Sequence, residues 1–194
     1  PDLIDETNLN RLVGGTRADV DTNELKIRIA GRAIRAVLPE ARITAHAKPW
    51  QEISSEFKHC DVIIGGLDSV IAKDEADRFS RRFLIPYIDM GMDVHKLGDR
   101  FLIAGQTILS SPGGPCLRCM GVVTEEALTT EAQRYGAAGG KPQVVWPNGV
   151  LASTAVGLFT QLVCPWHDKA MTAAYMEYDG NKHTVQPSMR LAAI

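Results

Sequence analysis

Three charged residues have the side-chain types that bind a polyphosphate. Arg11 closes the segment NLNR (8–11), Lys26 begins an apolar-periodic segment, and Asp68 follows directly on the apolar run DVIIGG (61–66). Arginine and lysine neutralise phosphate oxygens, and a carboxylate can hold the magnesium ion that accompanies them. The combination therefore indicates nucleotide chemistry.

Each of these residues also has a purely structural interpretation. Asp68 is an N-cap candidate for the helix that follows it. Lys26 can extend past the edge of the core to solvent, and Arg11 can be a surface charge. Both interpretations stay open for each residue taken alone, and it is the combination that favours a nucleotide.

The elements that must position these residues follow from periodicity. Apolar residues recur at helical spacing between Ile29 and Leu38 and predict a helix that ends before Pro39, and DxxE at Asp21–Glu24 has the spacing of its capping box. We expect Lys26 to leave this helix from the buried face of its first turn. Composition and alternation predict strands at 42–47, 61–66 and 84–91, and either a pair of short strands or one strand bent at Gly105 at 101–110. They also predict helices at about 70–82 and 151–163 and a hairpin at 173–188.

This order of elements predicts an α/β fold. We expect one domain over 1–194, with a Rossmann-like, mostly parallel sheet, helices on both faces and an antiparallel C-terminal extension. The stretch from 116 to about 148 is irregular and predicts a long crossover loop with one helix near 125–134. In such folds ligands bind beyond the carboxyl ends of the strands, where NLNR, Lys26 and Asp68 are expected.

Two cysteines, Cys116 and Cys119, form a CxxC that has the spacing of half a tetrahedral zinc site. Cys60 and Cys164 stand alone, and a pairing of Cys164 with His167 is less favoured than a structural turn. We therefore expect either further ligands beyond Ile194 or a CxxC without metal. A thioredoxin-type redox pair is disfavoured, because Pro115 precedes the motif and a loop follows it.

Composition narrows the class of protein. The chain of 194 residues has 45% hydrophobic and 23% charged residues, as in an ordinary globular domain, and no apolar run of membrane-spanning length. A net charge of −2 disfavours nucleic acid as a partner. Four cysteines without a disulfide-framework pattern favour a reducing, cytoplasmic location.

The motifs follow one another in an order that points to a family. NLNR, a lysine in the next helix, DVIIGGLDS, GQTILSSPGGPCLRCMG, an apolar helix and YMEYDGN occur in sequence. In this order they resemble the ThiF/MoeB/HesA family, the bacterial relatives of ubiquitin-activating enzymes, over nearly the whole chain. The resemblance implies an adenylyltransferase that binds ATP with Mg²⁺ and activates the C-terminal carboxylate of a ubiquitin-like protein or peptide.

The resemblance also implies roles for individual residues. By matching positions, Asn8 and Arg11 contact ATP, Lys26 contacts the phosphates and Asp68 holds the magnesium, so that Arg11, Lys26 and Asp68 carry the catalysis. Asp2 matches the second acidic position of the ribose-binding stretch. Cys116 and Cys119 match the first half of a structural zinc site.

Other implications concern what lies outside these residues. The family's glycine-rich nucleotide loop is expected before Pro1, and the second CxxC of its zinc site after Ile194. The predicted crossover loop contains no cysteine between 135 and 149, so transfer to an internal cysteine is expected only if one lies elsewhere. The resemblance leans toward a homodimer.

Two other classes of protein remain open. A non-catalytic, partner-binding module could keep the same fold without turnover. A nicotinamide or flavin oxidoreductase could use the same sheet, but it has little use for two phosphate-binding cations together with a metal-binding aspartate. A glycine-rich loop upstream of Pro1 would favour the adenylyltransferase over the module.

Overall fold

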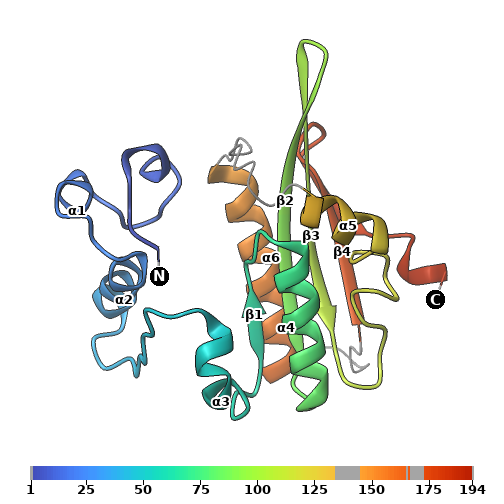
Figure 1. Ribbon diagram of the computed structural model, residues 1–194, viewed down its shortest axis with the longest axis horizontal. Coiled ribbons are helices and arrows are strands. Elements are labelled where there is room, and N and C mark those ends of the chain that lie inside the picture. Colours follow the sequence, from blue (N-terminus) through green and yellow to red (C-terminus); the bar gives the residue numbers. More distant parts are fainter. Residues whose placement is uncertain (1, 134–144, 165, 167–172, 194) are drawn as a thin grey trace. The chain divides into compact units, whose positions relative to one another are not determined.

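The computed structural model describes residues 2–133, 145–164, 166 and 173–193. The chain divides into two compact units, Pro1–Phe57 and Lys58–Ile194 (Figure 1). Each unit is described by itself. In the described part of the chain, no helix combines the length and the apolarity that a membrane span requires.

The first unit is built from short helices. They are listed in chain order as η1 (Glu6–Asn8), α1 (Arg17–Asp21), α2 (Lys26–Val37), η2 (Trp50–Ile53) and α3 (Ser54–Phe57). Ile4 and Ile29 are fully buried, and an antiparallel bridge joins Leu3 to Leu25. The predicted helix is therefore confirmed, with Lys26 as its first residue.

Two local predictions in the first unit are wrong. Residues 42–47 form no strand, because none of the described strands pairs with their backbone. The DxxE at 21–24 is no capping box: Asp21 ends α1, Asn23 turns the chain in the left-handed conformation, and Leu25 caps α2 without a side-chain hydrogen bond. The Glu24 carboxylate accepts a hydrogen bond from the Leu25 amide instead.

The second unit is a five-stranded sheet with helices. Its strands lie in the order β1 (Ile63–Gly65), β2 (Tyr87–Leu97), β3 (Arg100–Ser110), β4 (Ala173–Asp179) and β5 (Thr184–Pro187). The helices are α4 (Val70–Arg82), α5 (Glu125–Gln133), α6 (Val145–Val163) and the short η3 (Leu191–Ala193). These bounds confirm the predicted strands, helices and final hairpin of this half, with β3 as a single continuous strand.

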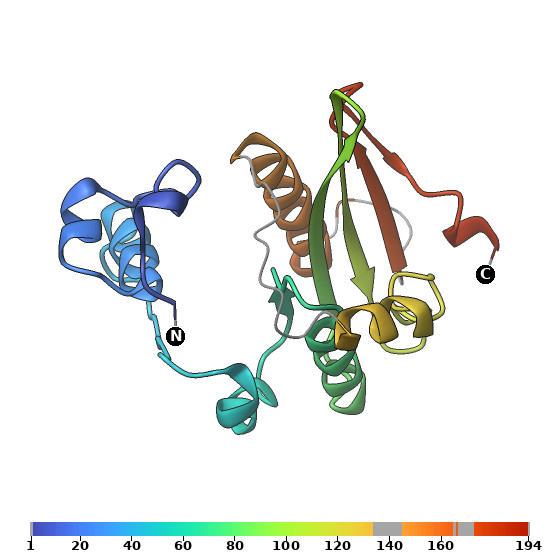
Figure 2. The same ribbon diagram turned by 45° about the horizontal axis from the view of Figure 1, so that its top comes forward.

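Helices cover both faces of the sheet, as predicted. Alternate residues of β2 point to opposite faces. Ile88 packs with Leu109, Ala155 and Leu158 beneath α6, whereas Tyr87 and Asp89 face α4. Figures 1 and 2 show α4 and α6 flanking the same strands.

The α/β class and the antiparallel extension are confirmed, but the sheet is less parallel than predicted. Only β1 and β2 run parallel among the described strands, and β2, β3, β4 and β5 pair antiparallel in succession. The absence of a strand at 42–47 and the long β2–β3 hairpin account for the difference. A carboxyl edge of parallel strands therefore exists at Gly65 and Asp89, and the loop leading to α4 begins there.

Candidate functional site

The turn that contains Asn8 is held by a reciprocal cap. The Asp5 carboxylate accepts hydrogen bonds from the Thr7 and Asn8 amides at 2.7 and 3.2 Å, and the Asn8 side chain bonds back to Asp5. The Thr7 hydroxyl lies closest and contributes most to lowering the pKa of Asp5. Asn8 is buried with its amide engaged, so the structure gives it the role of fixing this turn.

Arg11 extends from the same turn. Its Nη1 donates to the Thr7 carbonyl oxygen at 2.6 Å, and the residue is half-buried. The guanidinium keeps further N–H groups, since one arginine carries five donors. Among the described residues, Arg11 is therefore oriented by the Thr7 backbone rather than neutralised by a carboxylate.

Lys26 and Asp2 are brought together at the start of α2. The Lys26 amide donates to the Asp2 carbonyl at 2.9 Å, and its Nζ lies 3.1 Å from the Asp2 carboxylate. The ammonium also contributes to lowering the pKa of Asp5. The Asp2 side chain is largely exposed, so the pair can separate when a more highly charged anion arrives.

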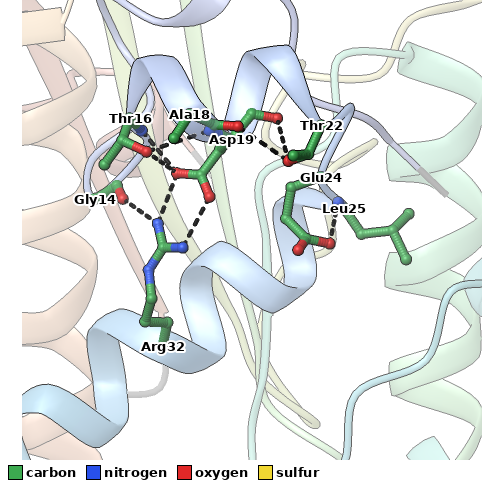
Figure 3. A network of polar contacts seen from close by, with 8 residues as sticks. All are labelled: Gly14, Thr16, Ala18, Asp19, Thr22, Glu24, Leu25 and Arg32. Atoms are coloured by element: carbon green, nitrogen blue, oxygen red, sulfur yellow. Dashed lines mark hydrogen bonds and ion pairs between the residues drawn. The ribbon is translucent and has the colours of Figure 1, made fainter.

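A network around Asp19 fixes the position of α1 against α2 (Figure 3). Arg32 donates to both Asp19 carboxylate oxygens at 2.8 and 2.7 Å and to the Gly14 carbonyl. Thr16 and Asp19 form the capping box of α1. Arg32 and Thr16 together lower the pKa of Asp19 well below its usual range. Arg32 therefore belongs to a structural pair that joins α1 to α2.

Asp68 lies in the second unit, between β1 and α4. Ser69 is the N-cap of α4 and accepts the Ala72 amide at 3.1 Å, so the capping interpretation of Asp68 is wrong. The Asp68 side chain is exposed and has no hydrogen-bond or ion-pair partner among the described residues. A carboxylate in this position is free to take a hard cation such as Mg²⁺.

The sequence interpretation missed a buried polar cluster next to this loop. Lys73 Nζ lies 2.6 Å from the Asp89 carboxylate and donates to the Met90 carbonyl at 2.7 Å. The Tyr87 hydroxyl donates to the other Asp89 oxygen at 3.0 Å. Burial raises the pKa of Asp89, and the charge of Lys73 opposes that shift. The available signal was an aspartate inside the otherwise apolar run LIPYIDMG.

Three residues of α4 clamp the segment that carries the CxxC. Asp77 accepts the Leu117 amide, Asp74 forms a bidentate pair with Arg118, and Arg81 donates to the carbonyls of Ser111 and Gly114. These contacts, all made from α4, hold both the CxxC turn and the residues that precede it. The cysteine positions are therefore set by protein contacts.

The two thiols of that turn face each other. Cys116 Sγ and Cys119 Sγ lie 3.2 Å apart, and hydrogen bonds with Cys116 lower the pKa of Cys119. Two sulfurs of a tetrahedral zinc site lie roughly 3.8 Å apart, given Zn–S bonds of about 2.3 Å. The observed separation is shorter than this value, and no group of three or more metal ligands exists in the described residues. His167 lies outside the described residues, and Cys164 is exposed.

The predicted site residues fall into two groups. Asp2, Asn8, Arg11 and Lys26 belong to the first unit, where the structure brings Asp2 and Lys26 into contact. Asp68, Cys116 and Cys119 belong to the second, with Asp68 on one end of α4 and the CxxC turn clamped along its side.

Comparison with known proteins decides the family. The model of the ThiF family matches residues 1–193. The chain belongs to the ThiF family. This confirms the resemblance that the ordered motifs carry.

A curated relative comes from Drosophila melanogaster. It is the Nedd8-activating enzyme E1 catalytic subunit, 27% identical over 132 residues. The match covers 61% of this chain and 27% of that protein, so this chain corresponds to about a quarter of that relative's length.

Solved structures show the same fold. MccB of E. coli in the complex titled MccB + MccA-N7isoASN has a TM-score of 0.72 at 17% identity, over 96% of this chain and 54% of that one. MccB with ATP has a TM-score of 0.68 at 15% identity over the same shares. PaaA has a TM-score of 0.65 at 12% identity, over 96% of this chain and 61% of its own. At these identities the likeness concerns the fold, and this chain spans a little over half of each.

Proposed function

We propose that this protein adenylates the C-terminal carboxylate of a ubiquitin-like protein or peptide with ATP and releases pyrophosphate. Membership of the ThiF family, a Nedd8-activating relative, and the MccB structures with ATP and with MccA support this class of reaction. The observation that carries the proposal is Asp68, an exposed carboxylate just past the end of a parallel strand whose expected capping role is taken by Ser69.

The reaction joins a carboxylate oxygen to the α-phosphorus of ATP. The bond from that phosphorus to the bridging oxygen of pyrophosphate breaks, and the products are an acyl-adenylate and pyrophosphate. A carboxylate is a weak nucleophile and pyrophosphate carries high charge, so positioning and charge neutralisation supply most of the acceleration. No proton transfer is needed for this step.

Within this scheme the predicted residues take distinct roles. We assign Arg11 and Lys26 to phosphate oxygens, with Lys26 leaving its exposed partner Asp2 as the nucleotide binds. Asn8 acts through the turn that it holds for Arg11. Asp68 is the residue that would hold Mg²⁺, and a bound ion would supply charge neutralisation on the phosphates.

Cys116 and Cys119 are proposed as one half of a structural zinc site. Two further ligands are required, from a longer chain or another protomer. Metal analysis of the full-length protein should find zinc that the Cys116→Ser, Cys119→Ser double variant loses. The zinc proposal fails if the full-length protein, purified without added metal, contains no zinc.

We also propose a homodimer, which sedimentation of the full-length protein tests.

Pyrophosphate exchange tests the function. The full-length protein should incorporate labelled pyrophosphate into ATP only when Mg²⁺ and a partner with a free C-terminal carboxylate are present. The same partner with an amidated C-terminus is the matched control and should give none. Absence of exchange across a broad panel of ubiquitin-like proteins and peptides would favour the non-catalytic, partner-binding module.

Substitutions at the proposed site test the assignments. Lys26→Ala and Asp68→Ala should lower exchange at least about 100-fold, the scale of losing one preorganised charge contact. Both side chains are at least partly exposed, so the melting temperature should change little. Arg28→Ala, which removes an exposed α2 arginine that pairs with Glu24, is the control. Unfolding of either site variant would instead indicate a structural role.

A further inference from the structure

Where strand β1 ends, the Lys73 side chain donates a hydrogen bond to a backbone carbonyl of β2. The parallel ladder begins with the Ile63 amide donating to the Pro86 carbonyl at 3.0 Å, and the last pair joins Gly65 to Asp89. Because every second residue of a strand bonds toward the same neighbour, residues 86, 88 and 90 face β1. Met90 therefore presents the next carbonyl where β1 has stopped, and Lys73 Nζ donates to it at 2.7 Å.

Lys73 is buried, and its ammonium is held by the Asp89 carboxylate and the Met90 carbonyl. Lys73 is 7% exposed and Asp89 is 0% exposed. Tyr87 occupies the second carboxylate oxygen of Asp89, so the pair has one geometry. A Cβ at Gly91 would lie 3.1 Å from Lys73 Nζ, and the strand keeps a glycine beside it. A buried ion pair of this kind adds little to stability compared with an apolar pair of the same size.

The backbone of Lys73 is linked to the loop that carries Asp68. Lys73 lies one turn into α4, and its amide donates to the Ser69 carbonyl at 3.0 Å. Ser69 is the N-cap, and Asp68 is the residue before it. The chain from Asp68 to Lys73 is therefore a single helical turn whose far end is fixed to the carboxyl end of β2.

We propose that Lys73, oriented by Asp89 and Tyr87, is a positioning residue that sets the place of Asp68 relative to the end of β2 and thereby tunes the Mg²⁺ requirement of the reaction. This inference rests on the proposed function, in which Asp68 holds the metal ion. Lys73 touches neither ATP nor substrate in this scheme. Its effect appears in the magnesium dependence rather than in the chemistry.

The test replaces the buried pair by apolar residues of similar volume in Lys73→Met, Asp89→Leu. The full-length double variant should fold with a lowered melting temperature, because the buried Tyr87 hydroxyl and the Met90 carbonyl lose their partners. Its half-saturating Mg²⁺ concentration in pyrophosphate exchange should rise about tenfold, with the maximal rate recovered at high Mg²⁺, as for other groups that orient a metal ligand. Lys73→Arg should restore most of the wild-type dependence, because it keeps the charge beside Asp89. Lys58→Met, an exposed lysine over the Phe83 ring, is the control.

An unchanged magnesium dependence in a stably folded double variant would overturn the proposal. If that variant does not fold, Gly91→Ala serves in its place, because the added methyl group crowds Lys73 without removing a charge. It should raise the half-saturating Mg²⁺ concentration, and a wild-type value would count against the positioning role.

A second readout separates this inference from the proposed function. If the wild-type protein shows no exchange, the proposed function fails, but deuterium uptake at 66–72 can still be compared. The double variant should take up deuterium faster there than wild type, while segments of β3 keep their rates. Equal uptake at 66–72 would overturn the positioning role on its own.

Discussion

Two ion pairs of almost equal length show how surroundings decide what a contact does. Arg32 lies 2.7 Å from Asp19 in the first unit, and Lys73 lies 2.6 Å from Asp89 in the second. The Arg32 side chain is half exposed. Hydrogen bonds from Arg32 and Thr16 to the Asp19 carboxylate lower its pKa. The second pair is buried, so the pKa of Asp89 rises despite the adjacent ammonium. Asp19 is itself buried, but Arg32 keeps about half of its side chain exposed, so the first pair joins two helices with one member in water. Both members of the second pair are buried inside the molecule.

Removing one cation from each pair should have the largest and most unequal effect. Lys73→Ala leaves a buried carboxylate without a counterion and should lower the free energy of unfolding by about 3–5 kcal/mol. Arg32→Ala should cost clearly less, because Thr16 still bonds to the Asp19 carboxylate and the loss of the half-exposed Arg32 side chain admits water to it. Urea unfolding of both variants measures the difference. Equal losses would show that burial does not separate the two pairs.

Acid titration should give slopes of opposite sign for the two carboxylates. Asp19 has a lowered folded-state pKa, so its contribution to stability is present above the unfolded value of about 3.9 and is lost as pH falls below it. Asp89 has a raised folded-state pKa, so its contribution is present in acid and is lost as pH rises from about 3.9 through the folded value.

Replacing each aspartate by asparagine removes its contribution to the pH dependence of stability. Asp19→Asn should flatten the loss of stability below about pH 4, and Asp89→Asn should make the acid loss of the whole protein steeper. Urea midpoints measured from about pH 2.5 to about pH 7, roughly 1.4 units below and 3 units above the unfolded carboxyl pKa of about 3.9, provide the comparison. Parallel profiles for the two variants would contradict the assignment.

Much of the second unit could be predicted from the sequence, because its signals are local. The run DVIIGG, the helix after it and the hairpin around Asp179 were all placed correctly from apolar periodicity and turn residues. The antiparallel pairing of β2 with β3 could not be predicted from these signals, since strand pairing depends on contacts far along the chain. The Lys73–Asp89 pair lies sixteen residues apart in sequence and closes only once α4 packs on the sheet.

The first unit was harder to predict for a related reason. DxxE matches the spacing of a capping box at 21–24, yet the cap forms at Thr16 and Asp19, one short helix earlier. The left-handed Asn23 ends that helix and redirects the chain. A motif of two residues cannot distinguish between such neighbouring starts. The cations Arg11 and Lys26 were identified by type, and their backbone and Asp2 contacts became visible only in the fold.

The smallest expected change in stability concerns two glycines, one at a buried position of a strand and one at an exposed position of a helix. A Cβ at Gly65 would overlap the ring and hydroxyl of Tyr87, so Gly65→Ala should cost about 1–3 kcal/mol. Gly157 lies in α6 with open space around it, so Gly157→Ala should stabilise by up to about 1 kcal/mol. Thermal unfolding of the two variants gives the signs. Stabilisation by Gly65→Ala would show that the Tyr87–Asp89 arrangement is not tightly packed.

The most direct test of the central claim is the identity of the product. The full-length protein should be incubated in a single turnover with ATP labelled at the α-phosphate, Mg²⁺ and a ubiquitin-like partner or peptide, and the products should be analysed by mass spectrometry. The account predicts AMP joined to the partner's C-terminal carboxylate, together with pyrophosphate, and neither product with Asp68→Ala. ADP and inorganic phosphate, or an unmodified partner across the whole panel, would contradict it.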